Sequence, residues 1–143
     1  SILQKFPFPK FGDERFLGES YVFNQIDDTY DMVVMNDRVY MFQYQNDGLS
    51  QDFRKLYRNN PMGFLASAVQ NLKYEDTIKS KVKLQAHIQC LAIRTGNFQT
   101  WLRSFCSMTG ILASLPSLYL YYRIFIQKVS DVKPYEVSTE IKQ

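Results

Sequence analysis

The clearest pattern in the chain is an apolar stretch from residue 104 to residue 122 that contains no charged side chain. Its nineteen residues match the length with which a helix crosses a hydrocarbon core of about 30 Å. Pro116 lies inside the stretch and is expected to kink a helix. The pattern predicts one long helix over residues 97–128, whose apolar part, 104–122, forms a single membrane span.

Aromatic and basic side chains stand at both ends of this stretch. With a rise of about 1.5 Å per residue, Trp101 and Tyr121 would lie about 30 Å apart on one helix, which is the separation of the two aromatic belts of a bilayer. The side chains expected to anchor the span at the membrane interfaces are Trp101, Arg103, Tyr119, Tyr121, Tyr122 and Arg123.

Small side chains recur within the stretch at intervals of four residues. In lipid, where apolar surface alone gives no drive to associate, small side chains let two helices approach closely. The alternative, favoured by the serines and by Pro116, is a buried and kinked helix inside a soluble protein. The predicted helix-packing interface consists of Thr109, Gly110, Ala113, Ser114 and Ser117.

Before the apolar stretch, residues 50–96 have the spacing of short amphipathic helices. The first helix ends before Asn60 and Pro61, which form a cap and first-turn pair for a second helix that ends near residue 72. A third helix is predicted to begin at residue 76 or 77 and to end at Arg94. A glycine follows it, as is common after a helix, and an asparagine that can cap the next one.

Residues 1–49 are predicted to form an extended arm followed by a β-hairpin. Prolines alternate with phenylalanines near the start, which favours an extended backbone. Such an arm could lie on a partner or form a strap over the protein's own core. Residues 30–44 contain two β-rich runs joined by Asn36 and Asp37, which tolerate a hairpin turn. With a polar tail at 129–143, the predicted fold is mainly α with a small N-terminal β-hairpin.

Composition and charge change this picture little. A chain with 45% hydrophobic and 22% charged residues is globular in type, and a net charge of +3 is too small to imply nucleic acid as a partner. Acidic residues dominate the first fifty positions and basic residues the next fifty. Lys79, Lys81 and Lys83 crowd the start of the third predicted helix and could contact lipid headgroups, although a solvated helix start is the alternative.

Candidate chemistry is sparse. His87 and Cys90 lie one helical turn apart and could supply two metal ligands, but no second pair follows them. Asp27, Asp28 and Asp31 could attract a cation, although the spacing and the distant glutamate of an EF-hand are missing. His87 is the only conventional base for a nucleophile, and the glycines are scattered singly. We therefore expect no catalytic, cofactor or metal site.

Together these features predict a non-catalytic structural or accessory subunit of a larger membrane protein complex. Small subunits of the mitochondrial respiratory chain and of ATP synthase have this general type of sequence, and a first residue other than Met would suit removal of a presequence. The expected location is the mitochondrial inner membrane, with lipid and other subunits of a hetero-oligomer as partners and no nucleic acid. The alternatives are a soluble helical adaptor of a ribonucleoprotein or similar assembly, and a small enzyme or metal protein that uses His87 and Cys90.

Overall fold

A computed structural model of the chain describes residues 2–31, 33, 36–37 and 52–127. All regular structure in these residues is helical, so the prediction of a mainly helical protein is confirmed. In chain order the elements are the 3₁₀ turn η1 (Ile2–Lys5), α1 (Ser20–Asp27), α2 (Phe53–Asn59), α3 (Pro61–Asn71), α4 (Ile78–Thr95), α5 (Phe98–Ser104), α6 (Met108–Leu112), α7 (Ser114–Tyr121) and the π turn η2 (Tyr122–Ile126).

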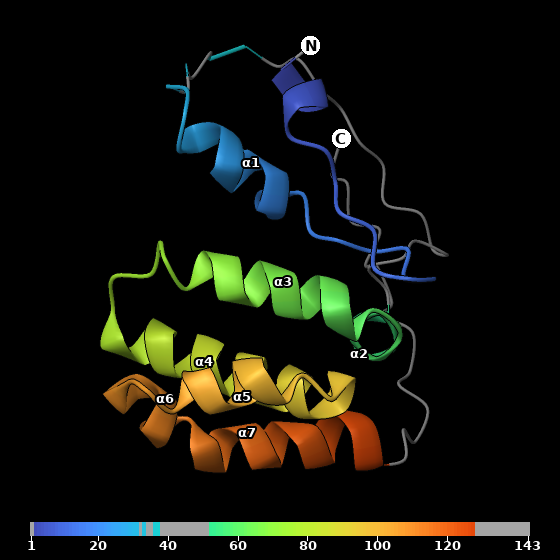
Figure 1. Ribbon diagram of the computed structural model, residues 1–143, viewed down its shortest axis with the longest axis vertical. Coiled ribbons are helices and arrows are strands. Elements are labelled where there is room, and N and C mark those ends of the chain that lie inside the picture. Colours follow the sequence, from blue (N-terminus) through green and yellow to red (C-terminus); the bar gives the residue numbers. More distant parts are fainter. Residues whose placement is uncertain (1, 32, 34–35, 38–51, 128–143) are drawn as a thin grey trace, which may run out of the picture.

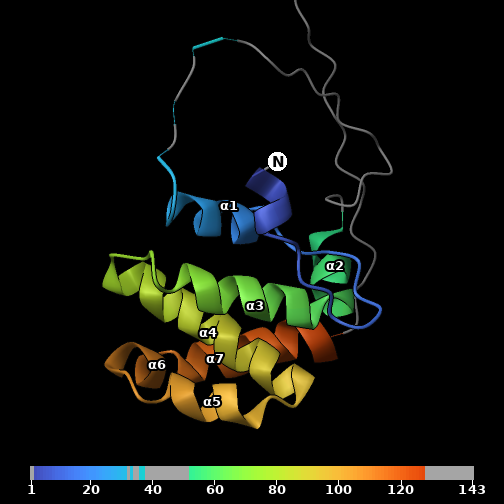
Figure 2. The same ribbon diagram turned by 45° about the horizontal axis from the view of Figure 1, so that its top comes forward.

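Helix α4 lies in the middle of the fold. Helix α3 packs on one side of it, and α5, α6 and α7 pack on its other sides (Figures 1 and 2). Helix α1 lies on the side of α3 that faces away from α4. Because neighbours cover α4 on several sides, Gln89, Cys90 and Leu91 are completely buried.

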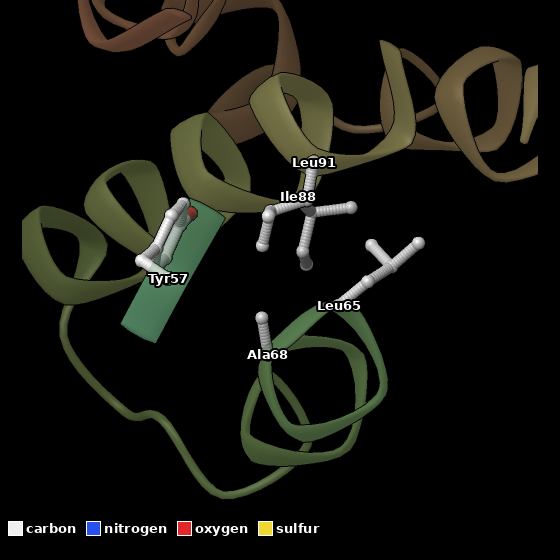
Figure 3. Close-up of a cluster of buried hydrophobic side chains, with 5 residues drawn as sticks. All are labelled: Tyr57, Leu65, Ala68, Ile88 and Leu91. Atoms are coloured by element: carbon white, nitrogen blue, oxygen red, sulfur yellow. The ribbon is translucent and has the colours of Figure 1, made fainter. Parts of the chain in front are cut away.

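The hydrophobic core lies between α3 and α4. Figure 3 shows Ile88 and Leu91 of α4 pointing toward Leu65 and Ala68 of α3, with Tyr57 of α2 beside them. All five side chains are at most 6% exposed. A fully buried Leu or Ile side chain contributes about 1.5–3 kcal/mol relative to an exposed one, so this cluster is the main apolar contribution to the fold.

The ends of α3 and α4 lie within about two residues of the ends predicted, which were 62 to about 72 for the second helix and 76 or 77 to 94 for the third. At the start of α4, the Thr77 hydroxyl accepts a hydrogen bond from the backbone N–H of Ser80 at 3.2 Å. At its end, Gly96 has a φ of 67°, the left-handed conformation that glycine adopts without steric cost. Local side-chain chemistry accounts for both ends.

The prediction of one long helix over residues 97–128 is wrong. Helix α5 ends at Ser104, and α6 begins at Met108. Ser107 caps α6, because its hydroxyl accepts a hydrogen bond from the N–H of Gly110 at 3.1 Å. Figure 1 shows α5 and α7 running in opposite directions, with α6 at the turn. A Cβ atom at Gly110 would collide with the carbonyl oxygen of Ser104, so only glycine allows this close approach.

The predicted membrane span over residues 104–122 is also wrong. Within the described part of the chain, every helix is too short or too polar to cross a bilayer. Pro116 does not lie inside a long helix; it lies in the first turn of α7, directly after the break between α6 and α7 at Ala113. The N–H groups of a first turn have no partner inside the helix, so proline costs no hydrogen bond there.

The predicted N-terminal β-hairpin finds no support. No strand is present among residues 2–31, 33, 36–37 and 52–127, and most of the hairpin residues, like the polar tail at 129–143, lie outside this set. Helix α1 occurs instead in a region expected to be irregular. Its buried Val22 and a 2.7 Å hydrogen bond from Asn24 Nδ2 to Asn71 Oδ1 tie it to α3.

Residues 14–16 form a strap over the junction of α2 and α3. The carboxylate of Glu14 accepts hydrogen bonds from the N–H groups of Met62 (2.8 Å) and Gly63 (2.7 Å), in the first turn of α3. The side-chain oxygen of Asn60 accepts from the N–H groups of residues 15 and 16. The N-terminal segment could lie on a partner or on the protein's own core, and these contacts are those of a strap over the core. The carboxylate of Glu14 also places a negative charge at the N-terminus of α3, where the helix dipole favours one.

Candidate functional site

The small residues predicted to receive a neighbouring helix face the inside of this molecule. Ala113 is 0% exposed and Ser117 is 2% exposed, Gly110 is buried, and Thr109 and Ser114 are half-buried. The helices that carry them, α6 and α7, pack on α4. These small residues are therefore buried inside the same chain, where α6 and α7 pack on α4 and Gly110 lies against Ser104 of α5.

A hydrogen bond lies inside this packing. The side-chain N–H of Gln89, on α4, donates to the carbonyl oxygen of Gly110 at 2.7 Å. The other end of the same amide, Gln89 Oε1, is buried without a partner among the described residues. The contact of α4 with α6 and α7 thus combines small and polar groups, unlike the apolar contact of α4 with α3.

The opposite side of α6 and α7 exposes large apolar side chains. On α7 and η2 they recur at intervals of three or four residues, which places them along one face of the helix. Leu115 is the most exposed, at 79%. We call this set the apolar stripe; its members are Met108, Ile111, Leu112, Leu115, Leu118, Tyr119, Tyr122 and Ile126.

The predicted interface anchors do not stand at two ends of one helix. Trp101 and Arg103 belong to α5, whereas the tyrosines and Arg123 belong to α7 and η2. Trp101 is half-buried and stacks on Phe98, with ring centroids 5.5 Å apart. Tyr121 is also half-buried, while Arg103, Tyr119, Tyr122 and Arg123 are exposed. The expected separation of two belts along a helix axis does not exist.

The segment that carries the apolar stripe has charge of one sign. Residues 98–127 contain no aspartate or glutamate, and their only charged side chains are Arg103 and Arg123. Arg123 lies in η2, beside the stripe residue Tyr122. The stripe is therefore an apolar surface with a basic edge.

A second feature is a cleft of about 420 Å³ between the strap, α2, α3 and α4. Aromatic side chains from three separate segments, Phe16, Phe53, Tyr57 and Phe64, form much of its wall. The other lining residues are Gly18, Ser20, Ser67, Ala68, Asn71, Glu75, Ser80, Lys83, Leu84, His87 and Leu91.

Burial favours the neutral forms of Tyr57 and His87, which line the cleft, and of Cys90 nearby. The Tyr57 hydroxyl and His87 Nδ1 share a hydrogen bond of 2.9 Å. Burial, together with the nearby Lys83, lowers the pKa of His87, and burial together with Cys90 raises the pKa of Tyr57. Burial also raises the pKa of the Cys90 thiol to about 12, so a metal-binding thiolate is disfavoured there.

The other polar candidates are dispersed. Asp28 accepts a hydrogen bond from the Tyr74 hydroxyl at 2.7 Å, and this bond is the main cause that raises the pKa of Tyr74. Within the described residues, no group of three or more His, Cys, Asp or Glu side chains could hold a metal ion. In the first turns of α4, Lys79 and Lys83 are exposed and Lys81 is half-buried; of the three, only Lys83 lines the cleft.

The aromatic cleft was not anticipated from the sequence. Phe16, Phe53 and Phe64 come from the strap, α2 and α3, and only the packing of these segments brings their rings together. The sole signal in the sequence is the high aromatic content, 15% of residues, which does not indicate where the rings meet. No protein-family model, curated protein or solved structure matches the chain.

Proposed function

We propose that this protein is a non-catalytic structural subunit of a membrane-associated complex, held at the membrane surface by the apolar stripe of α6 and α7. The observation that carries the proposal is the reversal of polarity across α7. Ala113 and Ser117 are buried, whereas Leu115 and Leu118 are 79% and 59% exposed. In water this arrangement leaves unburied the side chains that would stabilise the fold most.

The same arrangement suits a lipid environment. Where apolar side chains face hydrocarbon, helices associate through small residues and interhelical hydrogen bonds, as α6 and α7 do with α4. The short helices favour attachment along the interface rather than a crossing of the bilayer. Arg103 and Arg123, without a neighbouring acidic residue in 98–127, suit anionic headgroups.

The strength of such an attachment follows from the exposed area. Monomeric soluble proteins rarely expose a contiguous apolar patch of more than a few hundred Å², and larger patches mark binding surfaces. Each Leu or Ile side chain that becomes buried contributes about 1.5–3 kcal/mol, so a few members of the stripe would hold the chain at a membrane. Membership of a hetero-oligomeric complex and the mitochondrial inner membrane stay predictions from the sequence.

Sedimentation with vesicles tests the proposal. The full chain should co-sediment with phosphatidylcholine vesicles that contain phosphatidylserine, and less with phosphatidylcholine alone. The double variant Leu115→Glu, Leu118→Glu should bind about tenfold more weakly or worse, because both side chains would have to enter the interface charged. The matched control, Val69→Glu with Ile78→Glu, adds the same charge at exposed apolar positions outside the stripe.

Two results would refute the membrane proposal. One is that the wild-type chain co-sediments with neither kind of vesicle, and the other is that the two double variants lose binding equally. If the wild-type chain does not bind vesicles, and the variant Leu115→Glu, Leu118→Glu loses a protein that co-purifies with the wild-type chain, the soluble helical adaptor is the better assignment.

A further inference from the structure

The cleft beside α3 and α4 has the size and lining of a small-molecule site. Its volume of about 420 Å³ falls within the range of roughly 300–1,000 Å³ common for ligand sites. Such sites combine a mainly apolar wall with a few polar groups that orient the ligand. The cleft lies away from α6 and α7, so an inference about it goes beyond the proposed function.

The apolar wall is built around Phe64. The ring of Phe16 stacks on Phe64 with centroids 5.1 Å apart, Tyr57 lies 4.7 Å from it, and Phe53 meets it edge-on at 5.6 Å. Phe53 is 59% exposed, so one of these rings presents much of its surface outside the core. Flat rings in offset or edge-to-face contact accept a further planar ring at little cost in conformational entropy.

A polar group on the wall lacks a partner. The hydroxyl oxygen of Ser67 is buried and makes no hydrogen bond with any described residue. Gly18 stands beside it, since a Cβ atom placed there would lie 3.9 Å from Ser67 Oγ and 3.6 Å from Ser20 Oγ. A buried hydroxyl without a partner costs about 1–3 kcal/mol, and this one belongs to a residue that lines the cleft.

Positive potential at the cleft comes from Lys83 and from the start of α4. Lys83 lines the cleft, and Lys79 and Lys81 lie on the same first turns of α4, where the helix dipole adds positive potential. Lys79 and Lys81 are not among the residues that line the cleft. Glu75 also lines the cleft and is placed to accept a hydrogen bond from an amino or hydroxyl group of a ligand.

We infer that this cleft binds a small planar aromatic acid, with its ring against Phe64 and Tyr57 and its acidic group at Lys83. The Tyr57–His87 pair, joined by a neutral hydrogen bond, forms the floor near the ring. No chemical step is assigned to the site; its role is recognition.

Titration with 2-naphthoate, followed by amide chemical shifts of the full chain, tests the inference. Saturable shifts are expected at Ser67, Lys83 and His87. The neutral counterpart, 2-naphthalenemethanol, should bind about fivefold more weakly, because it lacks the charge that Lys83 attracts. Absence of saturation at millimolar naphthoate, or shifts confined to the apolar stripe, would overturn the assignment.

Two lysine variants distinguish binding of naphthoate in the cleft from a general attraction of the anion to the positive start of α4. Lys83→Gln should weaken naphthoate binding about fivefold and leave the binding of the neutral alcohol unchanged. Lys79→Gln, on an exposed side chain of the same helix that does not line the cleft, should change naphthoate affinity by less than about twofold. Both changes are at exposed positions, so the fold is retained. Equal effects of the two variants would show that no directed contact with Lys83 exists.

Discussion

The two sides of α4 follow opposite packing rules. Toward α3, the chain buries Leu65, Ile88 and Leu91. Toward α6 and α7, it buries Gln89 and Ser117 with other small residues, while the large apolar side chains of α7 face outward. The first contact is that of a water-soluble core, and the second is the arrangement that helices use in lipid. The α3–α4 half therefore buries large apolar side chains, whereas the α6–α7 half leaves its large apolar side chains exposed.

The largest expected effect contrasts two leucines, one on each side. Leu91→Ala should lower the free energy of unfolding by about 2–5 kcal/mol, because it opens a cavity in the core. Leu115→Ala, at a side chain that is 79% exposed, should change it by less than about 0.5 kcal/mol. Urea denaturation of both variants measures the difference. A similar loss in each would show that the apolar stripe contributes to folding.

A smaller effect is expected where the chain turns between α5 and α6. Gly110→Ala should lower the free energy of unfolding by about 2–3 kcal/mol, since its Cβ atom would meet the Ser104 carbonyl oxygen. Gly18→Ala is the control, because its Cβ atom would make only ordinary contacts. Thermal denaturation followed by circular dichroism compares the two. If Gly110→Ala is as stable as Gly18→Ala, the close approach of α6 to Ser104 is not required.

The α3–α4 half should also lose stability in mild acid. His87 is the only histidine, and its folded pKa is lowered from the ordinary value, mainly by burial. Below about pH 6.5 the unfolded chain therefore binds a proton that the folded chain binds less readily, so the free energy of unfolding falls as the pH falls.

Urea denaturation between about pH 7.5 and pH 5.5 measures this loss, and carboxylates titrate mainly below that window. The variant His87→Gln cannot take up the proton and should show a flatter dependence on pH. An equal slope in the two proteins would mean that His87 is as accessible to protons when folded as when unfolded.

The smallest effect concerns two serine hydroxyls, one on each side of α4. Ser67→Ala should raise the free energy of unfolding by about 0.5–1 kcal/mol, because the Ser67 hydroxyl is buried without a partner. Ser117→Ala should not raise it, because the Ser117 hydroxyl donates to the Ser114 carbonyl oxygen at 2.7 Å. Chemical denaturation ranks the variants, and the reverse order would contradict the account of the cleft wall.

The ends of α3 and α4 could be predicted because they depend on neighbours in the sequence. A cap such as Thr77 contacts a backbone N–H three residues away, and a glycine such as Gly96 acts through its own φ angle. The small residues of α6 and α7 were also visible as a pattern. Their partner was not, because spacing alone cannot distinguish a helix of the same chain from one of another subunit.

Tertiary structure decided the rest. An uncharged run of nineteen residues is compatible with one long helix or with helices that fold back, since the periodicity is the same up to the break. At the break between α5 and α6, Gly110 lies against the Ser104 carbonyl, and the Gln89 side chain of α4 donates a hydrogen bond to the Gly110 carbonyl. These residues come together only when the helices pack. The aromatic cleft is likewise built from the strap, α2, α3 and α4. By itself, then, the sequence determined a mainly helical chain, the ends of its middle helices and an apolar region near residues 104–122; packing decided which side of that region is buried.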